Sequence, residues 1–185
     1  FVGAYAGDAV TTVGSLVAIG HNALGVNTDG TGGTAVGAGA LDANTTGNNN
    51  TAVGQGALGA NTTASSNVAF GVNAGDAITT SPSNTCLGTN SGSAISTGSG
   101  ENVCVGNNAG ALMTTGAQNV IIGDNAVAGA ALTGSVNTVI GDNAGYAMTG
   151  ASNGNTLIGA ATGDAITTGD NNTAVGAYAL TSEDE

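Results

Sequence analysis

The chain of 185 residues contains no lysine and no arginine, and His21 is its single histidine. Because Lys and Arg supply most of a protein's affinity for phosphate groups, the sequence excludes binding to the backbone of DNA or RNA and docking on an anionic membrane. No catalytic triad or dyad can be assembled around a lone histidine. We therefore expect no enzyme, no nucleic-acid partner and no cofactor.

Aromatic residues make up 3 % of the chain, and tryptophan is absent. Large apolar side chains are also sparse, so a conventional globular core would be thin. The longest apolar run, Ala126 to Leu132, falls far short of the ~20 residues that a transmembrane helix needs, and we expect no membrane insertion. The chain begins inside a repeat and without an initiator Met, which we interpret as a piece of a longer protein.

One short phrase, Asn-(Thr/Val)-apolar-apolar-Gly, recurs along the whole chain. Its final glycines, called anchor glycines below, are spaced 17 or 18 residues apart: Gly3, Gly20, Gly37, Gly54, Gly71, Gly88, Gly106, Gly123, Gly141, Gly159 and Gly176. A fixed period of this kind is the sequence signature of a repeat architecture. We expect one repeat array over residues 1–180, with 181–185 as an acidic tail or the start of a further segment.

The repeat unit predicts an all-β fold. Helix is disfavoured because each interior glycine costs about 1 kcal/mol relative to alanine, and the 34 glycines are spread along the chain. A unit of 17 residues is too short for a helical pair and suits one coil of a β-solenoid or β-roll. About eleven coils at the ~4.8 Å strand spacing would form a rod on the order of 50 Å long.

Two apolar columns precede the anchor glycine. The residue immediately before it is always a large hydrophobe, and we interpret this column as the buried spine of each coil, with Val36, Val53, Phe70, Leu87, Val105, Ile122, Ile140 and Ile158 as its clearest members. The residue before that is apolar but mostly small, and it points to the opposite face of the strand. A strand that is apolar on both faces is covered on both faces, so the small column needs a partner.

A second pattern indicates an interior of constant volume. Coils with Leu four residues after the anchor glycine have Asn seven residues after it, as in Leu24 with Asn27, whereas coils with Gly at the first site have a large hydrophobe at the second, as in Gly75 with Ile78. One bulky group per coil fits a close-packed core of fixed cross-section. The coil that starts at Gly123 breaks this rule, and we expect a local shift of register there.

Asparagine lies four residues before the anchor glycine in eight coils: Asn50, Asn67, Asn84, Asn102, Asn119, Asn137, Asn155 and Asn172. Stacked amides can form a hydrogen-bonded ladder along a rod. We favour this structural ladder over the alternative, a row of contacts to a glycan.

Three other groups of residues admit both a chemical and a structural interpretation. Cys86 and Cys104 share a column in adjacent coils, within reach of a disulfide, but we favour two reduced thiols in alanine-like positions. The scattered carboxylates predict solvated side chains and no metal site. A threonine column eight residues after the anchor could bind ice, and we favour a ladder that stabilises turns; its members are Thr11, Thr28, Thr45, Thr62, Thr79, Ser96, Thr114, Thr149 and Thr167.

Phrases such as Asn50-Thr51-Ala52-Val53-Gly54 and Asn119-Val120-Ile121-Ile122-Gly123 resemble the head repeats of trimeric autotransporter adhesins and the shafts of phage tail-fibre proteins. The resemblance implies three parallel chains, each a β-roll, that share an axial apolar interface. We accordingly expect an extracellular, homotrimeric fibre segment of a viral tail or appendage that serves attachment to a host-surface glycan or protein. The alternatives are the head of a bacterial surface adhesin and a monomeric ice-binding solenoid.

Overall fold

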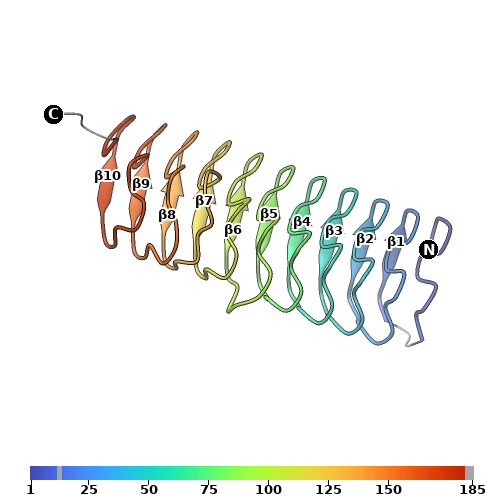
Figure 1. Ribbon diagram of the computed structural model, residues 1–185. Coiled ribbons are helices and arrows are strands. Elements are labelled where there is room, and N and C mark those ends of the chain that lie inside the picture. Colours follow the sequence, from blue (N-terminus) through green and yellow to red (C-terminus); the bar gives the residue numbers. More distant parts are fainter. Residues whose placement is uncertain (12–13, 182–185) are drawn as a thin grey trace.

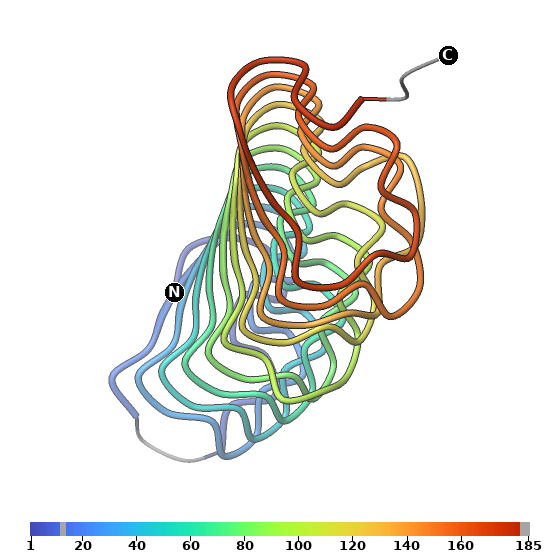
Figure 2. The same ribbon diagram turned by 90° about the vertical axis from the view of Figure 1, so that its left-hand side faces the viewer.

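The computed structural model describes residues 1–11 and 14–181, and it is a parallel β-solenoid (Figure 1). Successive coils lie side by side in chain order, so that the two ends of the chain lie at opposite ends of the stack. Figure 2 shows the coils nested with nearly the same outline along the stack. No helix is present in the described ranges, in agreement with the all-β prediction.

Each coil after the first contributes one three-residue strand directly before its anchor glycine. The ten strands found in the described part of the chain are β1 (Val17–Ile19), β2 (Thr34–Val36), β3 (Thr51–Val53), β4 (Val68–Phe70), β5 (Thr85–Leu87), β6 (Val103–Val105), β7 (Val120–Ile122), β8 (Thr138–Ile140), β9 (Thr156–Ile158) and β10 (Thr173–Val175). They form one parallel sheet in sequence order. The first repeat joins this sheet through a single bridge between Val2 and Ile19.

The anchor glycines permit the coils to stack closely. Gly106 has a φ of 132°, a conformation that side chains with a Cβ rarely adopt. A Cβ at this position would also collide with the carbonyl oxygen of Gly123 in the next coil. The repeat therefore requires glycine here for two independent reasons, backbone conformation and lack of space.

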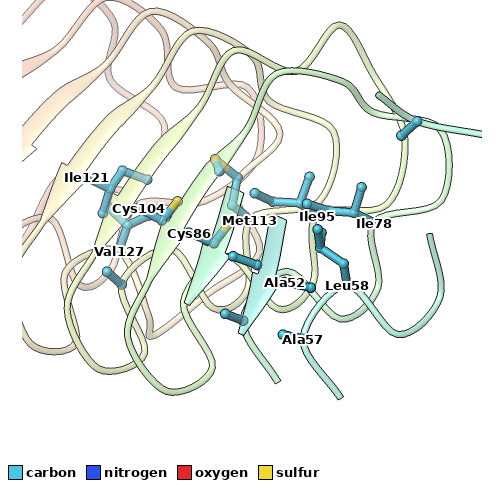
Figure 3. Close-up of a cluster of buried hydrophobic side chains, with 14 of the residues drawn as sticks. Ala52, Ala57, Leu58, Ile78, Cys86, Ile95, Cys104, Met113, Ile121 and Val127 are labelled. Carbon is cyan, nitrogen blue, oxygen red and sulfur yellow. The ribbon is translucent and has the colours of Figure 1, made fainter. Parts of the chain in front are cut away.

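The core lies inside the coil and has the alternating composition that the sequence pattern predicts. Leu24, Leu41 and Leu58 are fully buried in the early coils, and Ile78 and Ile95 fill the same interior in later coils that have Gly in place of Leu. The backbone at Leu58 has a φ of 51°, which is unfavourable for leucine by roughly 1–2 kcal/mol. Full burial of the side chain offsets this cost, because it contributes about 1.5–3 kcal/mol. Figure 3 shows this core around Leu58, Ile78 and Ile95.

The column that was expected to form the buried spine lies on the outside of the coil, so this prediction was wrong. None of its eight residues is buried, and Phe70 and Leu87 are 55 % and 45 % exposed. The column that faces inward is the small one, the middle residue of every strand, which is at most 4 % exposed: Ala18, Ala35, Ala52, Ala69, Cys86, Cys104, Ile121, Val139, Leu157 and Ala174. The physical reason is space, because the Leu, Ile and Met side chains that follow the anchor glycine already fill most of the coil.

The coil after Gly123 contains the expected register shift, but outside the sheet. Strands β7 and β8 pair without interruption, with Ile121 opposite Val139. In a regular coil the Thr62 N–H donates to the Thr79 carbonyl at 3.1 Å, whereas the Thr114 N–H donates to the Leu132 carbonyl at 3.0 Å. Leu132 stands one position later in its repeat than Thr79 does in its own, so the irregularity is absorbed in the turns and the strand stack is unaffected.

Candidate functional site

The most unusual surface is the outward face of the sheet, which we call the outer face and define as the first and last residues of β1–β10. Its last-residue column carries only Val, Ile, Leu and Phe, and its first-residue column carries Val or Thr. Ile19 and Ile158 are 43 % and 38 % exposed, and Val68 is 43 % exposed. A single chain thus presents an apolar strip along ten strands, and extended apolar patches of this kind are typical of interaction sites.

No charged residue lies on this face. The described carboxylates all lie in turns outside the strands, at Asp8, Asp29, Asp42, Asp76, Glu101, Asp124, Asp142, Asp164 and Asp170. Glu183, Asp184 and Glu185, which belong to the expected acidic tail, fall outside the described residues. Since the chain has 12 acidic residues and no lysine or arginine, the outer face is a neutral strip on an otherwise acidic rod.

The eight asparagines before the strands form a continuous amide ladder in the interior. The Asn84 side-chain oxygen accepts hydrogen bonds from both the backbone N–H and the side-chain amide of Asn102, at 3.2 and 3.0 Å. The Asn102 amide also donates to the Gly116 carbonyl at 2.9 Å, which ties it to the segment that precedes Asn119 in the next coil. Seven members are buried and Asn172 is half-buried. These amides are used inside the rod, so this column cannot form a row of contacts to a glycan.

A shorter ladder joins Asn27, Asn44 and Asn61 next to the long one, since the amides of Asn50 and Asn61 donate to the same Ala64 carbonyl. The Asn44 amide donates to the Asn27 oxygen at 2.6 Å, and the Asn61 amide donates to the Asn44 oxygen at 2.6 Å. The ladder ends because the next coil has Ile78 in place of asparagine, and the buried Asn61 oxygen has no hydrogen-bond partner. The sequence pattern paired these asparagines with Leu24, Leu41 and Leu58, but it did not indicate that their amides are buried and bond to one another.

The threonine column eight residues after the anchor glycine stabilises the turns. The hydroxyl groups of Thr28, Thr45 and Thr62 each donate to the carbonyl of the next threonine in the column, at 3.1, 3.0 and 3.1 Å. The same bond recurs at Thr79 and Thr149. At these positions the hydroxyl protons are engaged in bonds within the rod, as expected for a ladder that stabilises turns.

Among the described residues, the titratable groups are scattered. His21 contacts the ring of Tyr5 edge to face, with ring centroids 5.8 Å apart. Desolvation raises the pKa of Asp76 above its ordinary value of 3.8, although hydrogen bonds from the backbone of Ala77 and of Asp76 itself act in the opposite direction. Within the described ranges, no three His, Cys, Asp or Glu residues lie close enough together to hold a metal ion.

Cys86 and Cys104 are the two cysteines of the chain, and the fold brings them together. They are direct partners in the parallel pairing of β5 with β6, and both are buried as free thiols. Burial and the hydrogen bond between the two thiols raise the pKa of Cys104, the hydrogen bond being the larger cause. Figure 3 shows the two side chains next to each other inside the coil, close to Met113.

The comparisons with known proteins assign no relative to this chain. No protein-family model, no curated protein and no solved structure shows a significant match to it. In the part of the chain that the structure describes, no helix is long and apolar enough to cross a membrane.

Proposed function

We propose that this chain is a segment of a non-enzymatic extracellular fibre, in which parallel copies of the rod associate through the outer face. The observation that carries the proposal is this face itself: an uncharged strip of large hydrophobes that the isolated chain leaves open to solvent. We place the fibre in a viral tail or appendage, where it would hold a host-binding tip away from the particle. A bacterial trimeric adhesin head is the alternative that uses the same architecture.

A second copy of the chain is the partner that best fits the outer face. The strip repeats with each coil, at the ~4.8 Å spacing of neighbouring strands, so a parallel copy matches it strand by strand. A charged partner would find no complementary charge there, because all described carboxylates lie in the turns. Association through the outer face would bury its hydrophobic side chains and leave the acidic turns in water.

We propose a trimer of eleven-coil chains because three such strips can enclose a common axis. At each level of the stack one large side chain from each copy, such as Phe70 or Ile122, would meet its two equivalents. This arrangement reverses the one expected from the sequence, in which the small column faced the partner chains. It also leaves the interior of each coil, with its amide ladder, complete without a contribution from another chain.

The native mass tests the proposal directly. Sedimentation equilibrium is expected to give about three times the chain mass of 17.2 kDa. A monomer would overturn the fibre model, because the outer face would then be stable in water. An ice-recrystallisation assay on that monomer would test the remaining alternative, an ice-binding solenoid, in which the Thr and Val residues of the outer face would contact ice.

A pair of variants tests which face associates. Phe70→Asp combined with Ile122→Asp places two charges on the outer face, three strands or about 14 Å apart, far enough for salt to screen their mutual repulsion. We expect this variant to sediment as a monomer with unchanged circular dichroism. The matched control is Val26→Asp with Leu112→Asp, two residues that are 46 % and 42 % exposed outside the strands, and it should remain trimeric. Loss of the trimer in the control alone would place the interface elsewhere.

A further inference from the structure

The two cysteines of the chain occupy a single, directly paired position in the sheet. Cys86 in β5 is the register partner of Cys104 in β6. Neighbouring parallel strands lie about 4.8 Å apart, inside the Cα–Cα range of about 4.4–6.8 Å found for disulfides. Both side chains point inward from the pleat and are at most 1 % exposed. The chain contains no other cysteine, so neither thiol has another partner within the molecule.

The two sulfur atoms also share one pocket of space, which a glycine leaves open. A Cβ added to Gly92 would lie 2.8 Å from the Cys86 Sγ and 3.6 Å from the Cys104 Sγ. Gly110 lies over the other side of Cys104, where an added Cβ would be 3.0 Å from its Sγ. Both sulfur atoms therefore lie beside Gly92, and the two thiols are hydrogen-bonded to each other.

The sequence pattern favoured two reduced thiols, and the structure has both cysteines free. From the geometry of the pair we infer that, under oxidising conditions, Cys86 and Cys104 form a disulfide that joins two consecutive coils. The inference is independent of the proposed fibre function. The oxidant is a low-molecular-weight disulfide such as oxidised glutathione: one protein thiolate attacks it and releases one glutathione, and the second protein thiolate displaces the other. One protein S–S bond replaces one glutathione S–S bond, and the two thiol protons end on the two molecules of reduced glutathione.

The bond forms while the chain folds and not afterwards. Only the thiolate attacks a disulfide, and in the folded chain both thiols are buried away from any oxidant. The raised pKa of Cys104, caused first by its hydrogen bond with Cys86 and then by desolvation, reduces the thiolate fraction further. Folded protein that has been purified in reductant should thus resist oxidation, and refolding in a glutathione redox buffer should close the bond.

Cleavage at Glu101 gives a direct assay, because this glutamate lies between the two cysteines and the next glutamate is Glu183. The full chain is refolded with mixed reduced and oxidised glutathione, blocked with iodoacetamide in denaturant, and cut with a protease specific for glutamate. We expect residues 1–101 and 102–183 to migrate together without reductant and apart with it. Two separate fragments in both lanes, each carrying an alkylated cysteine, would overturn the inference.

A relocated cysteine supplies the matched control. The double variant Cys104→Ala with Ile121→Cys keeps two inward-facing thiols and the cleavage site between them, but it separates them by two strands, about 9.6 Å. This distance exceeds the disulfide range, so the fragments should separate without reductant. If they stay joined, the link arises from unfolded or intermolecular pairing, and the inference from strand register is wrong. A Cys86→Ala variant excludes any link that does not involve Cys86.

Discussion

The side-chain oxygen of Asn102 accepts two hydrogen bonds from Asn119, one from its backbone N–H at 3.0 Å and one from its side-chain amide at 3.1 Å. Replacing Asn102 with alanine removes this acceptor and also the donor to the Gly116 carbonyl. The Asn119 N–H and the Gly116 carbonyl would lose these partners in a buried site, at about 1–3 kcal/mol each. We expect Asn102→Ala to lower the free energy of unfolding by about 2–6 kcal/mol, measured by urea denaturation.

Asn107 is the control for this prediction. It is exposed, and its amide donates to the exposed Asp124 carboxylate at 2.9 Å. Asn107→Ala should change the free energy of unfolding by less than about 0.5 kcal/mol, as is usual for surface substitutions. Equal losses in the two variants would show that the buried ladder adds nothing beyond the general effect of removing an asparagine.

The anchor glycines lead to a second prediction, a difference in stability between two Gly→Ala variants. Gly106→Ala combines a φ of 132° with a collision against the Gly123 carbonyl, and we expect it to cost about 3 kcal/mol or more. At Gly39 the φ is 67° and an added Cβ meets nothing within 4 Å, so Gly39→Ala should cost only about 1–2 kcal/mol. Thermal unfolding followed by circular dichroism distinguishes the two. A larger loss at Gly39 would contradict the close stacking at the anchor.

Desolvation of Asp76 predicts a dependence of stability on pH. Because the folded-state pKa of Asp76 is raised, the folded chain binds its proton more readily than the unfolded chain does, and this carboxylate opposes folding at neutral pH. The opposition disappears as the pH falls below the ordinary value of 3.8. Asp76→Asn should therefore stabilise the protein at pH 7 and have no stabilising effect at pH 3.

The control for Asp76 removes the same charge from the same column. Asp164 stands at the equivalent position of a later coil and is exposed, so Asp164→Asn relieves general repulsion without relieving desolvation. The gain from Asp76→Asn at pH 7, measured as the shift in thermal midpoint, should exceed that of the control. An equal gain would mean that net charge alone, and not burial, accounts for the effect.

Salt should stabilise the rod. The chain carries 12 acidic residues without any Lys or Arg, so screening weakens repulsion and has almost no attractive pairs to weaken. Raising the salt from about 0.01 M to about 0.15 M shortens the Debye length from ~30 Å to ~8 Å, and the thermal midpoint should rise. A falling midpoint would require attractive charge pairs, which the sequence does not supply.

The repeat pattern correctly indicates the strand before the anchor glycine, but the second short strand that a coil of this length suggests is absent from the described residues. The period places each strand directly before its anchor glycine, as in β3 before Gly54 and β7 before Gly123. The register follows as well, since consecutive repeats pair residue for residue, with Ala52 opposite Ala69. A fixed repeat length leaves no other pairing in which each glycine meets the backbone of the next coil.

The inner and outer columns were assigned the wrong way round. Hydrophobicity alone places Val36 inside the coil and Ala35 outside it. In the structure the interior already holds Leu24 and Leu41, so that only the small Ala35 side chain fits there. A usable signal was present in the sequence: the middle strand residue is Ala where Leu follows the anchor, and it is larger at Cys104 and Leu157, where Gly follows it. Two columns whose sizes compensate in this way can share one interior; among the coils with Gly four residues after the anchor, Ala69 is the exception.

The partner of the outer face lies beyond sequence reasoning of this kind. The sequence at Phe70 and Ile122 would be the same whether these side chains contact a second chain, a different protein or ice. The hydrophobicity of these side chains shows that their contact with water is unfavourable. Which surface covers them instead depends on the shape and symmetry of the molecules that come into contact. Measurement of the native mass therefore supplies information that no pattern within one chain contains.

Every rung of the amide ladder has the same sense: the oxygen of an earlier asparagine accepts from the next one, from Asn50 to Asn67 and so on to Asn172. The most recently completed coil thus always exposes a ready acceptor toward the residues that follow it in the chain. A polypeptide that emerges from the ribosome with its N-terminus first can add coils one at a time in this direction. Each addition closes contacts only 17 or 18 residues apart, so the entropic cost of a new coil does not grow with the length of the rod. The architecture can be lengthened by duplicating repeats without making the chain slower to fold.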